Sequence, residues 1–189
     1  CMGLYDPVNG SVIHDGTDLQ QIDPADLRRN IGYVSQDVRL FFGTLRENLT
    51  LGTGDCEDED VLRAARISGL DRMVSTHPMG LDLRVGERGE GLSGGQKQSI
   101  AIARMLLQSP NVFLLDEPTS SMDHNTEQAF IAQFKAHVQG HTLLLATHKP
   151  AMLELVERLI VLDGGRIVAD GPRDAVLQAL TRPASPAAA

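Results

Sequence analysis

The sequence predicts an α/β fold built around a mainly parallel β-sheet. Two apolar runs, residues 111–115 and 142–146, have the length and composition of strands buried on both faces of such a sheet. Segments with helical spacing separate the predicted strands, and this alternation is typical of a parallel sheet with crossover helices. The chain has 189 residues, 42% of them hydrophobic and 22% charged. At roughly 150 residues per domain, this corresponds to one folded domain with a subdomain.

Strand and helix signals alternate near the start of the chain. Turn residues bound residues 10–16, which we predict to form a strand. Asp23-Pro24 places a capping acid before a proline at the first helical position, so a helix is predicted to begin there. Residues 31–35 predict a second short strand, which leads into Gln36.

The middle of the chain changes to helical spacing over residues 44–75. Within it, residues 57–67 carry acids in the first turn and arginines near the end, an order that suits the helix dipole. Gly69 is predicted to stop this helix. Residues 86–95 form a predicted glycine-rich loop, and residues 97–108 a predicted helix.

The last third of the chain continues the alternation. Residues 126–138 predict a helix between the two apolar strands. Residues 159–169 predict a β-hairpin that turns at Asp163-Gly164-Gly165. Residues 174–180 predict a closing helix, and residues 181–189 a disordered tail rich in Pro, Ala and Ser.

Charge and composition argue against several classes of protein. The net charge is −8, from 17 basic and 25 acidic residues, whereas a nucleic-acid-binding face is normally basic. The absence of Trp, with two Tyr and five Phe, leaves few rings for base stacking. Cys1 and Cys56 predict neither a disulfide framework nor a metal site, and we interpret both thiols as incidental in a reducing compartment. No apolar run approaches the about 18 residues of a membrane helix, and no signal peptide is predicted.

Ser93-Gly94-Gly95-Gln96 directly precedes a predicted helix. Adjacent glycines let the backbone approach a ligand closely, and the start of a helix presents unpaired N–H groups to it. With the Ser93 hydroxyl as a further donor, this segment is a candidate site for a phosphate group. The alternative is a flexible entry into the helix with no ligand.

Asp116 and Glu117 follow the apolar strand that ends at Leu115. Acids at the carboxyl end of a buried strand lie where α/β folds bind ligands. There Asp116 can hold Mg²⁺ through water, and Glu117 can polarise an attacking water. The alternative is a solvated acidic turn that contains Pro118.

Two further polar residues follow predicted strands. His148 comes after the second apolar strand and can donate to a phosphate oxygen, although a structural role is the alternative for a single histidine. Gln36 can orient a water or a metal ion, and by itself it is weak evidence.

In their order and spacing, these motifs resemble the nucleotide-binding domain of an ATP-binding cassette (ABC) transporter. The matching segments are Gln36, residues 92–96, residues 112–117, residues 120–123 and His148. The resemblance extends to about Leu180. It implies a P-loop NTPase-like ABC ATPase core with a mainly parallel sheet, together with a helical subdomain that carries the signature motif, residues 92–96.

The resemblance also implies an organisation along the chain. Residues 1–43 correspond to a partial ATP-binding core with the Q-loop, and residues 44–108 to the helical signature subdomain. Residues 109–180 correspond to the core from the Walker B strand to the switch histidine, followed by the C-terminal hairpin and helix. Residues 181–189 correspond to the tail.

ATP and Mg²⁺ are the ligands that the resemblance implies. By it, Gln36 is the Q-loop glutamine, which contacts Mg²⁺ and senses the transmembrane partner. Asp116 is the Walker B aspartate, which holds Mg²⁺ through water, and Glu117 is the general base for the attacking water. His148 is the switch histidine on the γ-phosphate. This division suits phosphoryl transfer, in which positioning and charge neutralisation supply most of the catalysis.

A second nucleotide-binding domain is an implied partner. The resemblance places Ser93, Gly94, Gly95 and Gln96 against the γ-phosphate of ATP held by the other subunit. It places Asp123 at the end of the D-loop, residues 120–123, which contacts the other subunit across the dimer.

Finer features resemble exporters within the family. Residues 85–89 are similar to the exporter X-loop, and residues 43–49 are also exporter-like. Residues 86–92, with residues 121–123 and 147–149, are most similar to type I secretion permease/ATPases, which export proteins. This implies ATP hydrolysis coupled to export, at the cytoplasmic face of the bacterial inner membrane. The implied partners are a transmembrane domain in the same parent chain, a periplasmic adaptor and an outer-membrane channel; a lipid, drug or peptide exporter is the alternative.

The family's Walker A loop, Gly-x-x-Gly-x-Gly-Lys-Ser/Thr, does not occur in these 189 residues. We expect it just upstream of Cys1, together with the first strand of the fold. The chain is therefore expected to be the C-terminal part of an exporter that hydrolyses ATP when intact, and to be inactive alone. A non-catalytic, partner-binding remnant is one alternative. A soluble ABC ATPase acting on ribosomes or DNA ends is another, but Gln36 and Leu92 are only 56 positions apart, which leaves no room for a coiled-coil insertion.

Overall fold

The computed structural model describes residues 2–181. The chain divides into two compact units, Cys1–Thr147 and His148–Ala189, and each is described by itself. The predicted disordered tail lies outside the described residues, except for Thr181, which ends helix α7.

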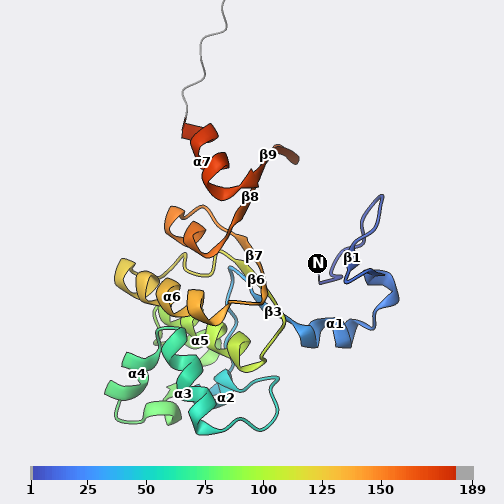
Figure 1. Cartoon of the computed structure of the whole chain (residues 1–189). Helices are drawn as coiled ribbons and strands as arrows, with labels where there is room; N and C mark the ends of the chain where they lie inside the picture. Colours follow the sequence, from blue (N-terminus) through green and yellow to red (C-terminus); the bar gives the residue numbers. More distant parts are fainter. Residues whose placement is uncertain (1, 182–189) are drawn as a thin grey trace, which may run out of the picture. The chain divides into compact units, whose positions relative to one another are not determined.

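A three-stranded parallel sheet with the order β3-β6-β7 lies in the first unit (Figure 1). Its strands are β3 (Ile31–Val34), β6 (Val112–Asp116) and β7 (Thr142–Ala146). Val34 is paired with Leu115, and Asp116 with Ala146, so the three carboxyl ends meet at one edge. This sheet, joined by helical crossovers, confirms the predicted α/β class.

The first unit also contains helices. The α-helices described there are α1 (Pro24–Asn30), α2 (Leu45–Leu49), α3 (Asp58–Ile67), α4 (Asp71–Thr76), α5 (Gly94–Leu107) and α6 (His124–His137). Short 3₁₀ turns are η1 (Leu19–Gln21), η2 (Gly80–Asp82) and η3 (Glu87–Gly89).

Helices α5 and α6 cover one face of the sheet. Phe113 of β6 packs edge-on against Phe134 of α6, with ring centroids 5.4 Å apart. On the neighbouring strand, a Cβ at Gly32 would lie 2.6 Å from Met105 Cγ and 2.6 Å from a side-chain carbon of Pro110. Glycine at this position therefore lets α5 approach the sheet closely.

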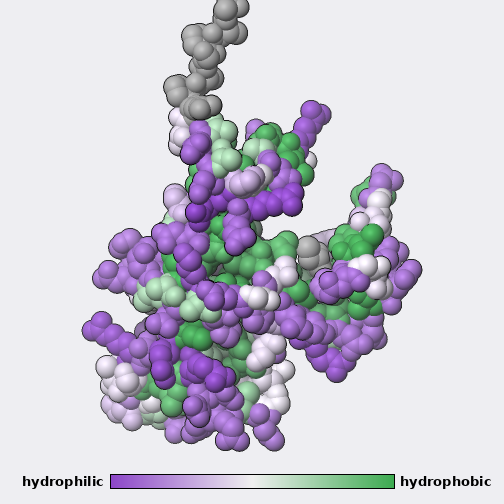
Figure 2. All heavy atoms as spheres, in the orientation of Figure 1, coloured by the Kyte–Doolittle hydropathy of each residue, from purple (hydrophilic) through white to green (hydrophobic). Residues whose placement is uncertain are grey.

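The opposite face of the sheet is only partly covered. Leu27 of α1 packs with Ile31 and Val112 in a small buried cluster. Further along this face Tyr33 is 42% exposed and Leu144 is 45% exposed, and Figure 2 shows hydrophobic surface where Figure 1 places the sheet. The prediction that residues 142–146 form a buried strand is correct for the strand but wrong for the burial. The reason is that its exposed residues, Thr142, Leu144 and Ala146, alternate along the strand and share the face that is only partly covered.

The helix signals of the sequence are confirmed. Asp23 Oδ1 accepts hydrogen bonds from the N–H groups of Ala25 (2.7 Å) and Asp26 (3.3 Å), so α1 begins at Pro24 as predicted. Helix α3 ends at Ile67, and Gly69 follows with a φ of +79°, a left-handed conformation that glycine adopts without strain.

Two predictions near loops are corrected. Strand structure over residues 10–16 is limited to β1 (Ile13–His14), because the chain turns back at Asp15-Gly16 and pairs as β2 (Thr17–Asp18). The glycine-rich loop of residues 86–95 contains η3, and its last two glycines already belong to α5. A short antiparallel pair, β4 (Gly43–Thr44) with β5 (Arg84–Val85), was not predicted.

The second unit contains the predicted hairpin and closing helix. Its elements are η4 (Pro150–Leu155), β8 (Arg158–Asp163), β9 (Arg166–Pro172) and α7 (Arg173–Thr181). Gly164 and Gly165 turn the hairpin with φ values of +53° and +76°. Arg158 holds the two strands together through paired 2.7 Å hydrogen bonds to both carboxylate oxygens of Asp170, which lower the pKa of that carboxyl.

Candidate functional site

The carboxyl edge of the sheet gathers three of the predicted residues. Asp116 is the last residue of β6 and Glu117 follows it, while Gln36 comes two residues after the end of the neighbouring strand β3. Asp116 and Glu117 are half-buried and Gln36 is exposed. Ligands in α/β folds bind at this edge because the loops that follow the strands can present side chains there without disturbing the core.

Glu117 has a strained backbone that its surroundings hold in place. Its φ is +46°, in the left-handed region that residues with a side chain rarely adopt. Its N–H donates to the carbonyl of Ala146 (2.9 Å), and its own carbonyl accepts from Nε2 of Gln98 (3.3 Å). Its carboxylate oxygen Oε2 accepts from the hydroxyl of Thr147 (3.2 Å). Contacts from β7 and α5 therefore fix the direction in which this carboxylate leaves the sheet.

Ser93 and Gln96 cap the start of α5 reciprocally. The N–H of Gln96 donates to Ser93 Oγ (3.2 Å), and the N–H of Ser93 donates to Gln96 Oε1 (2.8 Å). This capping box uses the predicted phosphate-contacting side chains to stabilise the helix start. Of the first N–H groups of α5, which have no carbonyl partner within a helix, that of Gln96 is bonded to Ser93, and those of Gly94 and Gly95 come before it. N–H groups at a helix start are the usual donors of an anion-binding site.

Positions 94 and 95 have no room for a side chain, because Ser121 of the same chain lies against both glycines. A Cβ at Gly94 would lie 2.8 Å from Ser121 Cβ, and a Cβ at Gly95 would lie 3.0 Å from the Ser121 carbonyl oxygen. Close approach by a ligand was the reason predicted for these glycines. The structure shows that the loop before α6 makes such an approach itself.

Gln98 is a residue that the sequence analysis missed. Its side chain is 2% exposed and lies between α5 and the loop of residues 117–121, with hydrogen bonds to Glu117, Ser120 and Ser121. The available signal was its position one turn after Gly94 and one turn before Ile102, on the buried face of the helix. A polar side chain on such a face predicts specific hydrogen-bond partners.

Asp123 caps α6. Its two carboxylate oxygens accept from the N–H (3.0 Å) and the hydroxyl (2.7 Å) of Thr126, and these bonds hold the pKa of Asp123 below its usual value. An ionised side chain at this position also suits the helix dipole.

His148 is the first residue of the second unit and is exposed. It directly follows Thr147, whose hydroxyl contacts Glu117. Along the chain, His148 comes two residues after Ala146, the last residue of β7.

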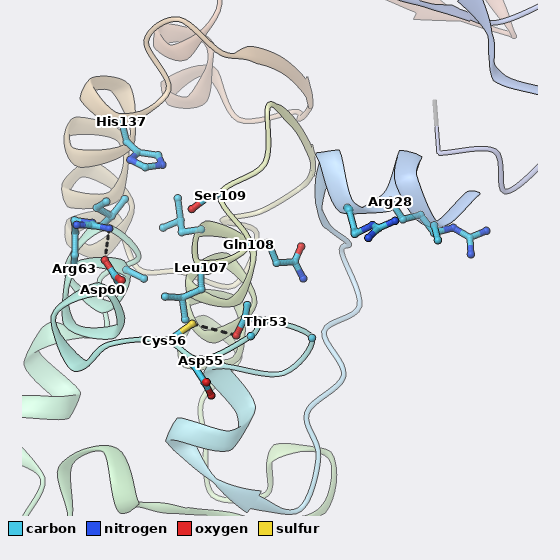
Figure 3. Close-up of a pocket in the computed structure, with 17 residues that line it drawn as sticks. Arg28, Thr53, Asp55, Cys56, Asp60, Arg63, Leu107, Gln108, Ser109 and His137 are labelled. Atoms are coloured by element: carbon cyan, nitrogen blue, oxygen red, sulfur yellow. Dashed lines mark hydrogen bonds and ion pairs between the residues drawn. The ribbon is translucent and has the colours of Figure 1, made fainter. Parts of the chain in front are cut away.

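A pocket of about 540 Å³ lies at the amino-terminal end of the strands, opposite the carboxyl ends (Figure 3). Gln108 and Ser109, which precede β6, line it together with Arg28 and Arg29 of α1 and with Cys56. None of the predicted site residues is among the described residues that line it. Cys56 donates to Thr53 Oγ1 (3.3 Å) there.

Residues 2–181 contain neither a cluster of metal-binding side chains nor a membrane-spanning helix. Their His, Cys, Asp and Glu side chains form no group of three or more that could hold a metal ion. None of their helices has the length and apolar character needed to cross a membrane.

A family model described as "ABC transporter" matches residues 1–120. The chain belongs to the ABC transporter family. Among its curated relatives in this family is the "Uncharacterized ABC transporter ATP-binding protein YwjA" of Bacillus subtilis, 38% identical over 176 residues, which are 93% of this chain and 31% of that protein. The "Leukotoxin translocation ATP-binding protein LktB" of Mannheimia haemolytica is 40% identical over 175 residues, 93% of this chain and 25% of LktB.

A solved ABC exporter has the same fold. The "Structure of a bacterial Atm1-family ABC exporter with ATP bound" matches 94% of this chain and 31% of that protein, with a TM-score of 0.90 and 33% identity. The chain thus spans about a quarter to a third of the length of these ABC proteins.

Proposed function

We propose that this chain forms part of the ATP-binding domain of an ABC exporter that couples ATP hydrolysis to export. One observation carries the proposal: Asp116 and Glu117 stand at the carboxyl end of β6, beside the strand that leads to Gln36. The names of the relatives support it, because they describe ATP-binding and translocation proteins and an exporter with ATP bound.

The residues at the sheet edge fit the needs of phosphoryl transfer. Mg²⁺ prefers oxygen ligands and is usually held by one or two carboxylates together with water and phosphate oxygens, so Asp116, with the amide oxygen of Gln36, is a suitable donor set. When bound there, Mg²⁺ would neutralise charge on the phosphates. Glu117 accepts a proton from the attacking water, and its restrained backbone holds the carboxylate in line for that task. His148 donates to the γ-phosphate oxygens.

The signature motif acts on a second copy of the domain. In the proposed dimer, Ser93, Gly94, Gly95 and Gln96 present the N-terminus of α5 to ATP held by the partner, because that helix end favours negative charge. Asp123, through the loop that it ends, contacts the partner as well.

We propose a protein as the exported substrate, by type I secretion. LktB, 40% identical, is described as a leukotoxin translocation protein. The partners are then a transmembrane domain in the same parent chain, a periplasmic adaptor and an outer-membrane channel, and the domain lies at the cytoplasmic face of the inner membrane. The second candidate is an exporter of lipids, drugs or peptides. The likeness to an Atm1-family exporter bears on it only in one respect, since an exporter whose title names no toxin has the same fold.

The test begins with the reading frame upstream of Cys1 in the source genome. A Walker A loop preceded by membrane-length apolar segments is expected. The full-length protein should then hydrolyse Mg-ATP, and Glu117→Gln should abolish turnover while ATP still binds. A frame without a Walker A loop, or turnover that survives Glu117→Gln, would overturn the proposal.

A further inference from the structure

Gln98 is the one buried side chain that joins α5 to the loop after β6 by hydrogen bonds among the described residues. Its Nε2 donates to the carbonyl of Glu117 (3.3 Å) and to Oγ of Ser120 (2.6 Å). Its Oε1 accepts from the N–H of Ser121 (2.8 Å). The partners fix the orientation of the amide, because a carbonyl can only accept and a backbone N–H can only donate.

The hydrogen bonds of Gln98 connect the signature motif to Glu117, two parts of the proposed mechanism. Gln98 lies one turn after Gly94, so it belongs to the same end of α5 as the signature motif. Its bond to Glu117 reaches a residue whose φ of +46° is strained and must be held by its neighbours. Ser121, its third partner, also packs against Gly94 and Gly95. The start of α5 and residues 117–121 are therefore one packed and hydrogen-bonded assembly.

We propose that Gln98 is a positioning residue for Glu117, and that it transmits the position of the signature motif to the carboxylate that accepts the proton. The inference depends on the proposed function of Glu117 as the general base. Gln98 reaches Glu117 only through its backbone carbonyl, so it directs the carboxylate without touching the substrate. A shift of α5 moves the Glu117 carbonyl through this bond, and the side chain turns with it.

The test uses the full-length exporter and two substitutions at the same position. Gln98→Met keeps the length of the side chain and removes all three hydrogen bonds. Gln98→Glu keeps an acceptor for Ser121 and removes the donor to the Glu117 carbonyl. The same two changes at Gln108, the exposed residue that follows α5, are the matched controls.

We expect both Gln98 variants to lower kcat by about 10- to 100-fold, because small errors in the placement of a catalytic group are costly. The KM for ATP should stay within about twofold of the wild-type value, since Gln98 acts on the base and not on nucleotide binding. Both Gln108 variants should keep the wild-type kcat. A kcat within about twofold of wild type in both Gln98 variants, or a raised KM with unchanged kcat, overturns the inference.

Hydrogen exchange provides a readout that does not depend on turnover. In Gln98→Met the peptide of residues 117–122 should exchange faster, by about tenfold at the Ser121 amide, whereas Gln98→Glu should keep that amide protected. Equal exchange in wild type and Gln98→Met contradicts the inference. Glu117→Gln separates the two proposals: if that variant still hydrolyses ATP, the proposed function fails; if it is inactive while the Gln98 variants are fully active, only the role of Gln98 fails.

Discussion

Gly94 lies so close to Ser121 that a β-carbon at position 94 would come within 2.8 Å of the Ser121 Cβ. The neighbouring Gly95 faces the backbone of the same loop, where a β-carbon would lie 3.0 Å from the Ser121 carbonyl oxygen. The two glycines therefore differ in what opposes them, a small side chain at one and a main chain at the other.

This difference predicts distinct behaviour for Gly94→Ala and Gly95→Ala. Each should destabilise the domain by about 1–3 kcal/mol, the usual cost of inserting a methyl group into a packed contact. Adding Ser121→Gly should restore most of the loss for Gly94→Ala and little for Gly95→Ala, because only the first clash is with a side chain. Urea unfolding of the single and double variants measures this. Gly54→Ala, where no atom lies within 4 Å, is the control; equal rescue of both variants would contradict the prediction.

Arg104 of α5 links this helix by hydrogen bonds to the segment that follows Gln36. Its Nε donates to the carbonyl of Asn48 (2.8 Å) and its Nη1 to the carbonyl of Arg39 (3.3 Å). Asn48 is itself 1% exposed and bonds both the N–H and the carbonyl of Phe41 at 2.9 Å. Burial lowers the pKa of Arg104, yet these carbonyl partners keep the guanidinium in place.

Arg104→Met should therefore cost about 1–3 kcal/mol of stability, since it leaves carbonyl oxygens without their donor. Arg104→Lys should cost less, because one ammonium donor can still reach a carbonyl. Thermal unfolding compares the two variants with Arg66→Met, a change on the exposed side of α3. If Arg104→Met unfolds at the same temperature as Arg66→Met, the anchoring role is wrong.

His137, at the end of α6, should make stability depend on pH. Burial beside Phe113 and Phe134 lowers its pKa below 6.5, and the nearby His141 and Arg63 lower it further. As the pH falls through 6.5, the unfolded state binds a proton at this residue more readily than the folded state does. The free energy of unfolding should therefore fall. Well above 6.5, from about pH 7.5, both states are neutral at this residue and the effect is absent.

His137→Phe should flatten the decline in stability between about pH 7.5 and about pH 5.5, and His124→Phe should leave it unchanged. His124 is the matched control because it starts the same helix and is exposed. Chemical unfolding across this pH range gives the slopes. A slope that His137→Phe leaves as steep as in wild type would rule out this histidine as its source.

Local signals were sufficient for much of the fold. Asp23-Pro24 placed the start of α1, and Asp163-Gly164-Gly165 placed the turn of the hairpin, because each signal depends on residues that are neighbours in sequence. The exposure of Leu144 could not be found in this way. Its apolar run indicates a strand, but burial depends on which elements lie beside β7, and that is a property of the tertiary arrangement.

The candidate site shows the same limit. The positions of Asp116 and Glu117 follow from the end of an apolar strand, whereas the bond between Gln98 and Glu117 joins residues 19 positions apart. The sequence singles out the glycines at 94 and 95 for close approach by a ligand, and the contact that the structure gives them is with Ser121. The spacing of residues in the sequence indicates which side chains suit a ligand. Only the three-dimensional structure shows which other residues of the chain contact those side chains.

A polypeptide of these 189 residues alone should neither bind ATP tightly nor hydrolyse it. The sequence holds no Gly-x-x-Gly-x-Gly-Lys-Ser/Thr segment, so it lacks the backbone cradle and the lysine that bind the β- and γ-phosphates. In the proposed mechanism, Asp116 and Glu117 position Mg²⁺ and water only around phosphates that are already held. Mg-ATPase assays of the purified chain and of its Glu117→Gln variant should give the same background rate. Turnover in the purified chain that Glu117→Gln abolishes would show that another segment of this chain holds the phosphates.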